Sequence, residues 1–252
     1  MCTLALYFRA SNAFPLVIAA NRDEFYERPT LAPGLIAHDP DVVAGLDLQA
    51  GGTWLGTNEH GLSVGILNRR NAEGPDPTRK SRGLLCLELL QTRGPDEAER
   101  LLRSRRAADY NWFNLLVADR EQAFVAGNHH DEMSVRRLES GLYVLTNLEV
   151  DDFTCPRIAK CYARFQAVTL PDRASGLPAL AAALREILSD HELPLDPRLA
   201  VPLNTLCIHT PAYGTRSSTL IVHHACGRVE YLHADGPPCQ AAYQPVELPW
   251  AR

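Results

Sequence analysis

The sequence predicts an α+β protein in which helices cover the outer faces of stacked antiparallel sheets. Short apolar or β-branched runs, separated by turn residues, occur in three blocks along the 252 residues, which indicates strands joined by short connections. Two blocks with helical periodicity lie between them. Because sheets and amphipathic helices each bury one apolar face, they are expected to pack in layers. No composition break, repeat or low-complexity linker interrupts the chain, so residues 1–252 are expected to form one domain.

The first two strands are predicted to form a hairpin, Cys2–Phe8 and Leu16–Ala20, and the polar residues Asn21–Glu24 close the second strand. Pro and Gly residues in 26–50 predict a long loop with at most one short strand. Further strands are expected at 53–57, 62–67, 113–118, 122–126, 133–138, 142–145, 215–222 and 228–233, with an extended piece at 240–247. The four strands within 113–145 are expected to form one antiparallel meander.

Helical periodicity predicts helices over 83–92, 96–105, 156–168 and 177–188. Asp96 is placed as the N-cap region of the second helix. In the last helix the apolar residues recur at Leu177, Leu180, Leu184 and Leu188, which is typical of a helix that buries one face.

Composition excludes several classes of protein. A net charge of -5 and a pI near 6.0 argue against a general nucleic-acid binder, which carries a basic face. No apolar run approaches the length of a membrane span. The apolar N-terminus is interrupted by Arg9, Asn12 and Pro15, so it is interpreted as the first strand of the mature protein and not as a signal peptide.

The cysteines and histidines predict neither a disulfide framework nor a bound metal. Seven cysteines occur without any CxxC pair, which favours a reducing cytoplasm and makes structural zinc unexpected. The pairs His129-His130 and His223-His224 cannot easily chelate one ion, because adjacent strand residues point to opposite faces. No cofactor is expected.

Cys2, read together with Asn21–Glu24, is the candidate for chemistry. A buried strand that carries a carboxylate and a guanidinium needs partners for both, and the first strand is its natural neighbour. Methionine aminopeptidases remove Met1 when the next residue is small. Cys2 would then carry a thiol and an α-amine, whose pKa of about 7.7–8.0 lets it take the thiol proton. The alternative is that Cys2 is only a small buried hydrophobe.

Such a nucleophile needs a carboxylate to orient the amine, donors for an oxyanion and a cation near the substrate. Asp23 is the candidate carboxylate, and Arg22 or Arg216 the candidate cation.

Five motifs together resemble the NRDE-motif family, whose animal members are called transport and Golgi organisation protein 2. They are Cys2 at the terminus, Ala19-Ala20-Asn21-Arg22-Asp23-Glu24-Phe25, Gly51-Gly52-Thr53-Trp54-Leu55-Gly56, Asn147 after Leu145-Thr146, and Tyr213-Gly214-Thr215-Arg216-Ser217-Ser218-Thr219. They follow one another in order over most of the chain, so the resemblance concerns the whole domain.

That family resembles the N-terminal-nucleophile (Ntn) hydrolases with a cysteine nucleophile, such as penicillin V acylase, bile salt hydrolase and acid ceramidase. The resemblance implies a four-layer αββα sandwich. It also implies that Cys2 is the nucleophile, that Asp23 lies beside its amine and that Asn147 belongs to the oxyanion hole. Asn68 would be a second oxyanion or substrate-facing residue, and Arg216 matches a late arginine.

Three further residues are predicted to lie at the substrate: Asn21, Arg22 and Trp54. Trp54 can equally be a core residue. The related hydrolases place an arginine three residues before the aspartate, and Ala20 stands there in this chain. Arg22 would point to the face opposite Asp23, so the cation at the thiol would be Arg216 or would be missing.

Two functions of different classes follow, together with one structural alternative. The first is hydrolysis of a small-molecule carbon–nitrogen amide bond through a thioester at Cys2. The second is a non-catalytic carrier or metabolite-handling protein on the same fold, related to haem, lipid or acyl-CoA. The third is that Asn21–Glu24 has a structural role alone. All three imply a small-molecule partner or none, and the sequence predicts no oligomeric state.

Overall fold

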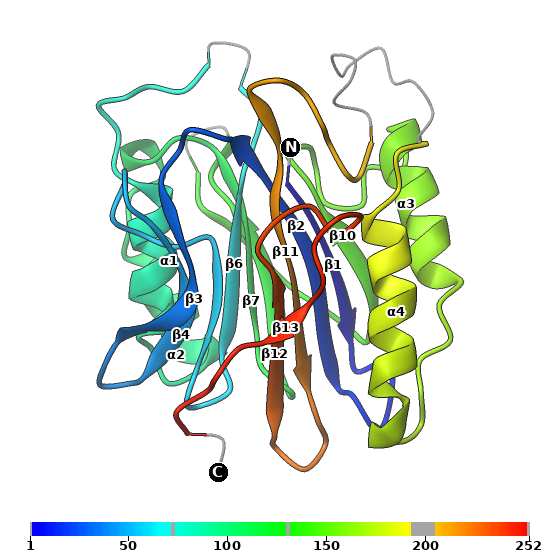
Figure 1. Ribbon diagram of the computed structural model, residues 1–252. Coiled ribbons are helices and arrows are strands. Elements are labelled where there is room, and N and C mark those ends of the chain that lie inside the picture. The colour runs from blue at the N-terminus through cyan, green and yellow to red at the C-terminus, as the bar shows by residue number, and fades with distance from the viewer. Residues whose placement is uncertain (1, 72–73, 130–131, 193–204, 251–252) are drawn as a thin grey trace. The chain divides into compact units, whose positions relative to one another are not determined.

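The computed structural model describes residues 2–71, 74–129, 132–192 and 205–250 (Figure 1). Met1, whose removal the sequence predicts, and His130 lie outside these ranges. The chain divides into two compact units: unit 1 comprises Met1–Glu27 and Ser140–Val246, and unit 2 comprises Arg28–Glu139 and Glu247–Arg252. The single domain expected over 1–252 stays a prediction.

Unit 1 contains a six-stranded sheet with the strand order β10-β1-β2-β11-β12-β13, in which every pairing is antiparallel. Its strands are β1 (Thr3–Phe8), β2 (Leu16–Phe25), β10 (Gly141–Leu145), β11 (Tyr213–His223), β12 (Val229–Ala234) and β13 (Gln244–Pro245). The predicted hairpin β1–β2 is confirmed, with Thr3 opposite Asn21 and Phe8 opposite Leu16. Only Gln244–Pro245 of the extended piece expected at 240–247 forms a strand.

The strand β2 is longer than the sequence predicts. Asn21–Glu24 do not follow the strand but lie inside it, because β11 pairs with β2 from Leu16 through Phe25. This second neighbour, about 190 residues away in the chain, supplies backbone partners where the hairpin alone would end. The polar tetrapeptide is therefore held on both sides by strands.

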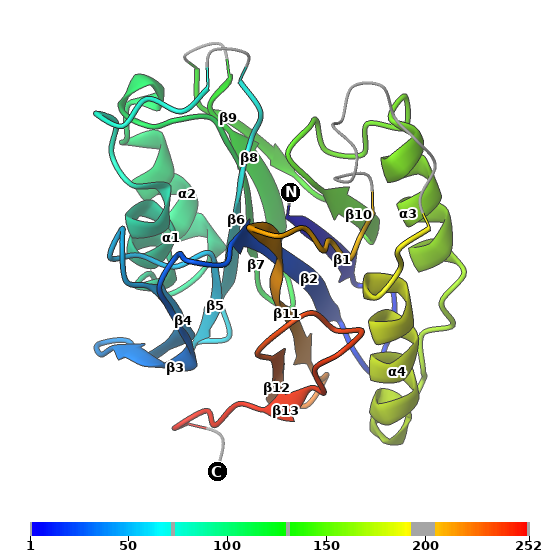
Figure 2. The same ribbon diagram turned by 45° about the horizontal axis from the view of Figure 1, so that its top comes forward.

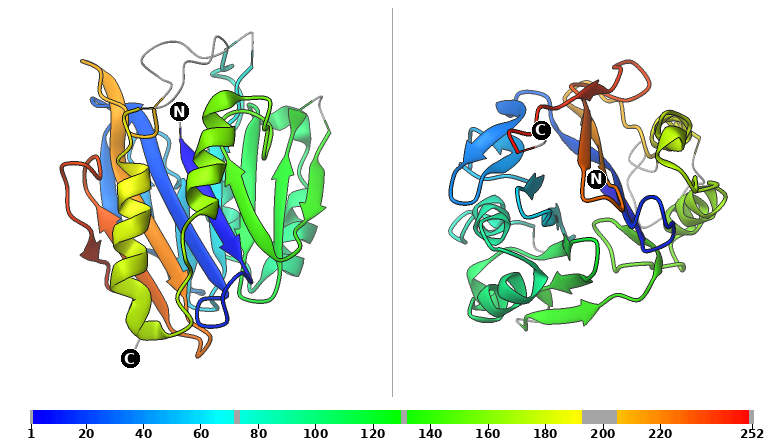
Figure 3. Two further views of the ribbon diagram at one scale, coloured as in Figure 1. Left: turned by 90° about the vertical axis from the view of Figure 1, so that its right-hand side faces the viewer. Right: turned by 90° about the horizontal axis from the view of Figure 1, so that it is seen from below.

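Two helices, α3 (Pro156–Gln166) and α4 (Leu177–Leu188), cover one face of this sheet (Figure 3, left). The core under them contains Val17 and Ala19 of β2, together with Leu180 and Leu184 of α4. Alternation along β2 therefore directs Asn21 and Asp23 to the helix-covered face and Arg22 to the opposite one. Both helices were predicted from the sequence, and a 3-10 turn at Ala174–Gly176 precedes α4.

Unit 2 contains a seven-stranded antiparallel sheet with the order β3-β4-β5-β6-β7-β8-β9. Its strands are β3 (Thr30–Ala37), β4 (Val42–Asp47), β5 (Leu55–Asn58), β6 (Ser63–Asn68), β7 (Phe113–Ala118), β8 (Ala123–Gly127) and β9 (Ser134–Arg137). The helices α1 (Arg82–Leu90) and α2 (Pro95–Arg103) pack on it (Figure 2), and a 3-10 turn at Ala107–Asp109 follows.

Three expectations for unit 2 are corrected. The predicted loop 26–50 contains two strands, β3 and β4; Pro33 and Gly34 are tolerated because β3 is an edge strand with irregular register. The meander ends after β9, and the strand Gly141–Leu145 pairs instead with β1 in unit 1. The N-cap of α2 is Gly94, with Pro95 at its first position; Asp96 lies in the first turn, where its charge is favourable.

Two sheet layers and two helical layers make up the described chain, which confirms the α+β class with antiparallel sheets. Among the described residues, no helix has the length and apolar character needed to cross a membrane.

Candidate active site

Strand register places Cys2 beside a residue of the neighbouring strand β2. On one side Thr3 is opposite Asn21 in β2, and on the other Leu4 is opposite Leu145 in β10. Continuing the β1–β2 register by one residue puts Cys2 opposite Arg22. Asn147 lies two residues beyond β10, which ends at Leu145. Directly opposed residues of antiparallel strands share a face of the sheet. Cys2 and Arg22 therefore share one face of the sheet, and the place of Asn147 beside the thiol stays a prediction.

The thiol of Cys2 contacts the main chain of Asp23. The Asp23 amide donates to Sγ at 3.4 Å, and the thiol donates to the Asp23 carbonyl oxygen at 3.7 Å. Burial raises the pKa of the Cys2 thiol, and the Asp23 carboxylate adds to that rise, whereas the Arg22 guanidinium lowers it. Because burial outweighs the cation, the thiol is neutral near pH 7 and needs a base before it can attack.

The carboxylate of Asp23 is held in place by β11. Its Oδ1 accepts a hydrogen bond from the Thr215 hydroxyl at 2.6 Å, and that hydroxyl accepts one from the Ile208 amide at 2.9 Å. The Tyr213 hydroxyl donates to the carbonyl oxygen of Asp23 at 3.2 Å, and burial raises the pKa of Tyr213. Asp23 is only 5% exposed, so these bonds fix a buried carboxylate one residue from Arg22.

The expectation for the cation is corrected in one respect. Arg22 does lie on the face opposite Asp23, as alternation predicts, but Cys2 shares that face through its register with Arg22. The charge of Arg22 accordingly acts on the thiol. Arg216 is the extra residue of a β-bulge between Thr215 and Ser217 in β11. Its role in orienting a substrate stays a prediction.

The two asparagines of unit 1 that the sequence predicts at the site, Asn21 and Asn147, differ in their bonding. Asn21 Nδ2 donates to the carbonyl oxygens of Leu188 and Leu206 at 2.8 and 2.9 Å, and its Oδ1 accepts from the Ser218 hydroxyl at 2.7 Å. These bonds tie β2 to the end of α4 and give Asn21 a structural role; its contact with substrate stays a prediction. Asn147 Oδ1, by contrast, is buried and has no hydrogen-bond partner among the described residues.

Trp54 and Asn68 belong to unit 2. The half-buried Trp54 ring lies against Gly45 of β4, where an added Cβ would come within 2.4 Å of the ring. Asn68 ends β6 and lines a pocket of about 240 Å³. Three arginines line the same pocket: Arg69, Arg70 and Arg82. The roles of Trp54 and Asn68 at a substrate stay predictions.

Sequence reasoning missed Arg157, which is 1% exposed. Its Nη2 donates to the Thr3 hydroxyl at 2.8 Å and to the Thr205 carbonyl oxygen at 3.3 Å, so its partners in the described part of the chain are neutral oxygens. The signal was available: Arg157, Ile158, Cys161 and Phe165 share the buried face of α3. Arg157 thus links α3 to the strand that begins after Cys2.

Known proteins of similar sequence match most of this chain. The family model described as Transport and Golgi organisation 2 matches residues 1–235. The Transport and Golgi organization protein 2 homolog of Bos taurus is 33% identical over 251 aligned positions, which cover 88% of this chain and 87% of the relative.

Solved structures share the fold at low identity. Penicillin V acylase from Agrobacterium tumefaciens superposes with a TM-score of 0.54 and 15% identity, covering 93% of this chain and 83% of the acylase. The N-acylethanolamine-hydrolyzing acid amidase ortholog of Caenorhabditis elegans gives 0.56 and 14%, covering 88% and 92%. These likenesses confirm the predicted Ntn-hydrolase-like fold. The matches over nearly the whole sequence show that the chain belongs to the Transport and Golgi organisation 2 family.

Proposed function

We propose that this protein is an N-terminal-nucleophile hydrolase that cleaves a carbon–nitrogen amide bond of a small molecule through a thioester at Cys2. The observation that carries the proposal is the contact of the Cys2 thiol with the main chain of Asp23, within reach of the charge of Arg22. Proteins of the same fold, named as an acylase and an acid amidase, act on such bonds. The likeness to them supports the reaction class without identifying the substrate.

Removal of Met1 would place an α-amine on Cys2, and this amine takes the thiol proton. The sulfur attacks the amide carbonyl carbon, and the charge on the carbonyl oxygen is stabilised by Asn147. The leaving nitrogen takes the proton as the carbon–nitrogen bond breaks, which leaves a thioester. Water then attacks the thioester, the acid is released, and the thiol is restored. The scheme needs no cofactor.

Three charged residues have distinct tasks in this scheme. Asp23, fixed by Thr215, orients the ammonium that forms on Cys2. The charge of Arg22 lowers the pKa of the Cys2 thiol and so offsets part of the increase that burial causes. Arg216 orients the substrate. All seven cysteines are free, which favours a reducing compartment such as the cytoplasm for a thiol enzyme.

The test is an acyl-amide substrate panel, run on protein whose intact mass shows that it begins at Cys2. We expect turnover by this protein, an acyl adduct on Cys2 in rapid-quench mass spectra, and loss of both in Cys2→Ala. Cys226→Ala is the matched control, because Cys226 is an exposed free cysteine in the turn between β11 and β12. Full turnover by Cys2→Ala, or no turnover by the processed protein on any amide, would overturn the proposal.

A second candidate function is a carrier of an anionic metabolite, and the arginine-lined pocket of unit 2 favours it. The described residues that line this pocket include Arg69, Arg70 and Arg82 and no carboxylate. Arg82 also donates to the Trp112 carbonyl oxygen at 3.0 Å, which holds its guanidinium at the pocket wall. Guanidinium groups bind phosphates and carboxylates in two-point geometry, so acyl-CoA and haem propionates are suitable ligands.

Titration with acyl-CoA, followed by calorimetry, and with haemin, followed at the Soret band, tests the carrier. We expect binding that weakens in the double variant Arg69→Ala/Arg82→Ala and that is unchanged in Arg120→Ala, an exposed arginine outside the pocket. Binding that is unchanged in Cys2→Ala, together with no amide turnover by the wild type, would select the carrier over the hydrolase. Equal affinity in the double variant would exclude the pocket as its site.

A further inference from the structure

Four metal-ligating side chains meet in unit 1, away from Cys2 in the sequence. They are His191, Cys207, His209 and Cys239, and one potential ligand atom from each lies within 4.8 Å of all the others. They come from three separate segments: the chain after α4, the chain before β11 and the turn before β13. Cys207 is buried, and the other three lie toward the surface.

The distances between these atoms match the edges of a metal-centred tetrahedron. With Zn–S of about 2.3 Å and Zn–N of about 2.0–2.1 Å, tetrahedral angles require about 3.8 Å between two sulfurs and about 3.5 Å between sulfur and nitrogen. The two Sγ atoms of Cys207 and Cys239 are 3.6 Å apart. Nε2 of His209 is 3.6 Å from the first sulfur and 3.3 Å from the second.

The fourth side chain is oriented as metal-bound histidines usually are. Nδ1 of His191 is 3.0 Å from the carbonyl oxygen of Cys207. An Nδ1–H that donates to this oxygen leaves the lone pair of Nε2 for a metal, and such a bond to a carbonyl fixes both tautomer and ring angle. The rings of His191 and His209 lie 5.1 Å apart between centroids, so both can face one point.

We propose that His191, Cys207, His209 and Cys239 bind one Zn²⁺ in a structural site. Two thiolates and two imidazoles in tetrahedral array form a donor set that selects zinc among the common divalent ions. Four protein ligands leave no open position for substrate, which is the pattern of a structural and not a catalytic zinc. The sequence spacing hid this site, because the two cysteines lie 32 residues apart and form no CxxC motif. A bound zinc would overturn the sequence-based prediction of no metal.

The proposed zinc ligands Cys207 and His209 belong to a segment whose main chain forms hydrogen bonds with residues of the candidate active site. Between the ligands Cys207 and His209, the Ile208 amide donates to Thr215, which in turn donates to Asp23. One residue before Cys207, the Leu206 carbonyl oxygen accepts from Asn21. Zinc would therefore fix the stretch of chain on which the positions of Asn21 and Asp23 depend, whether or not Cys2 is catalytic.

Elemental analysis of the full-length protein, purified under reducing conditions without chelator, tests the proposal directly. We expect about one zinc per chain in the wild type, and loss of that zinc in the double variant Cys207→Ser/Cys239→Ser. Replacing the metal by Co²⁺ should give the visible bands of tetrahedral cobalt and thiolate-to-cobalt charge transfer. His209→Ala should lower zinc affinity by more than about 100-fold, since loss of supporting contacts to a ligand alone costs about 10–100-fold.

Cys226→Ser is the matched control, because it removes an exposed thiol of the same unit that lies outside the cluster, and it should keep the full zinc content. The wild-type measurement does not depend on how well any variant folds. Zinc-free reduced protein that takes up neither Zn²⁺ nor Co²⁺ would overturn the proposal. So would metal content unchanged in the double cysteine variant, or a Cys207–Cys239 disulfide in the protein isolated from cells without added oxidant.

Discussion

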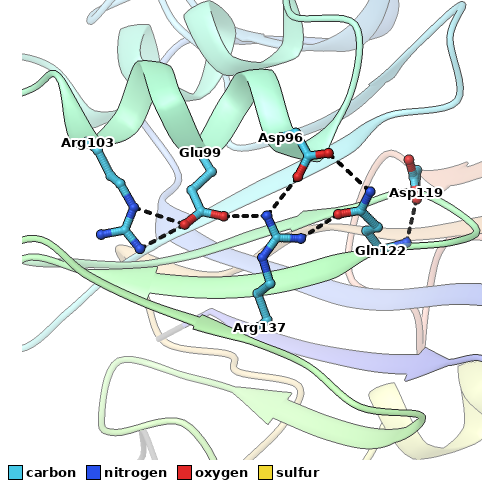
Figure 4. Close-up of polar contacts among 6 residues, drawn as sticks. All are labelled: Asp96, Glu99, Arg103, Asp119, Gln122 and Arg137. Carbon is cyan, nitrogen blue, oxygen red and sulfur yellow. Dashed lines mark hydrogen bonds and ion pairs between the residues drawn. The ribbon is translucent and has the colours of Figure 1, made fainter.

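Two polar clusters of this molecule use the same kinds of groups in opposite surroundings. The buried network of unit 1 consists of Asn21, Asp23, Thr215 and Ser218, each exposed by no more than 5%. The surface cluster of unit 2 joins α2 to β9 and to the turn before β8, and consists of Asp96, Glu99, Arg103, Gln122 and Arg137 (Figure 4). Water replaces a broken bond in the surface cluster and cannot do so in the buried network. Burial, and not the number of bonds, therefore decides how much each cluster contributes to stability.

The largest expected effect of a substitution is that of Asn21→Ala. It removes three hydrogen bonds and leaves the carbonyl oxygens of Leu188 and Leu206 and the Ser218 hydroxyl without their amide partner. We expect the free energy of unfolding to fall by about 4 kcal/mol, since each buried unpaired group costs about 1–3 kcal/mol. Urea denaturation measures it. A loss below about 1 kcal/mol would mean that water reaches this network and that the contrast with unit 2 is wrong.

The next effect is a pH dependence that arises from His233, which lies beside Thr219 with 3.0 Å between Nδ1 and Oγ1. Burial lowers the pKa of His233 to about 4. Between this value and the ordinary value of about 6.5, the unfolded chain binds a proton that the folded chain does not, so stability rises with pH. The contribution is complete above about pH 6.5 and is lost as pH falls toward 4, by up to about 3 kcal/mol.

Denaturation midpoints of wild type and His233→Gln, measured from pH 7 down to pH 4, test this dependence. Below about pH 6.5 the midpoint of the wild type should fall faster with decreasing pH than that of His233→Gln. Above about pH 6.5 the two midpoints should change with pH in parallel. Parallel curves throughout would show that the imidazole is hydrated in the folded state.

A smaller loss is expected for Thr215→Val, which keeps the shape of the side chain and removes its hydroxyl. The Asp23 carboxylate loses a donor and the Ile208 amide loses an acceptor. A hydrogen bond to a charged group is worth about 1.5–3 kcal/mol, so we expect unfolding to be easier by about 2 kcal/mol. Thr215→Ser restores the hydroxyl and should restore most of this stability. If serine and valine behave alike, packing and not the bond to Asp23 explains the loss.

What the sequence could predict follows from the range of the contacts involved. The hairpin and the helix α4 were predictable because each depends on residues near one another in the chain. The pairing of β2 with β11 was not, and the length of β2 depends on it. The same pairing brings Thr215 to Asp23.

In the candidate site, too, the sequence indicated which residues matter but not which of them come together. The motifs indicated Cys2, Arg22, Asp23 and Asn147 as residue types, but only the register of β1 with β2 brings Cys2 next to Arg22. Arg157 escaped notice because an arginine at a helix start usually lies in solvent.

The smallest effect is expected in the surface cluster, for Arg137→Ala. Arg137 is 53% exposed and donates to Asp96 and Glu99 at 2.7 Å each. The bond from Arg137 holds the pKa of Asp96 below its usual range, and the bonds from Arg103 and then Arg137 do the same for Glu99. Exposed ion pairs contribute less than about 1 kcal/mol and are screened by salt. The difference between Arg137→Ala and wild type should therefore shrink as NaCl is raised, whereas that of Asn21→Ala should not change. It should also shrink as pH falls through the lowered pKa values, because protonated carboxyl groups no longer attract the guanidinium. If Arg137→Ala instead lowered the free energy of unfolding as much as Asn21→Ala does, independently of salt, then burial would not decide how much each polar cluster contributes to stability.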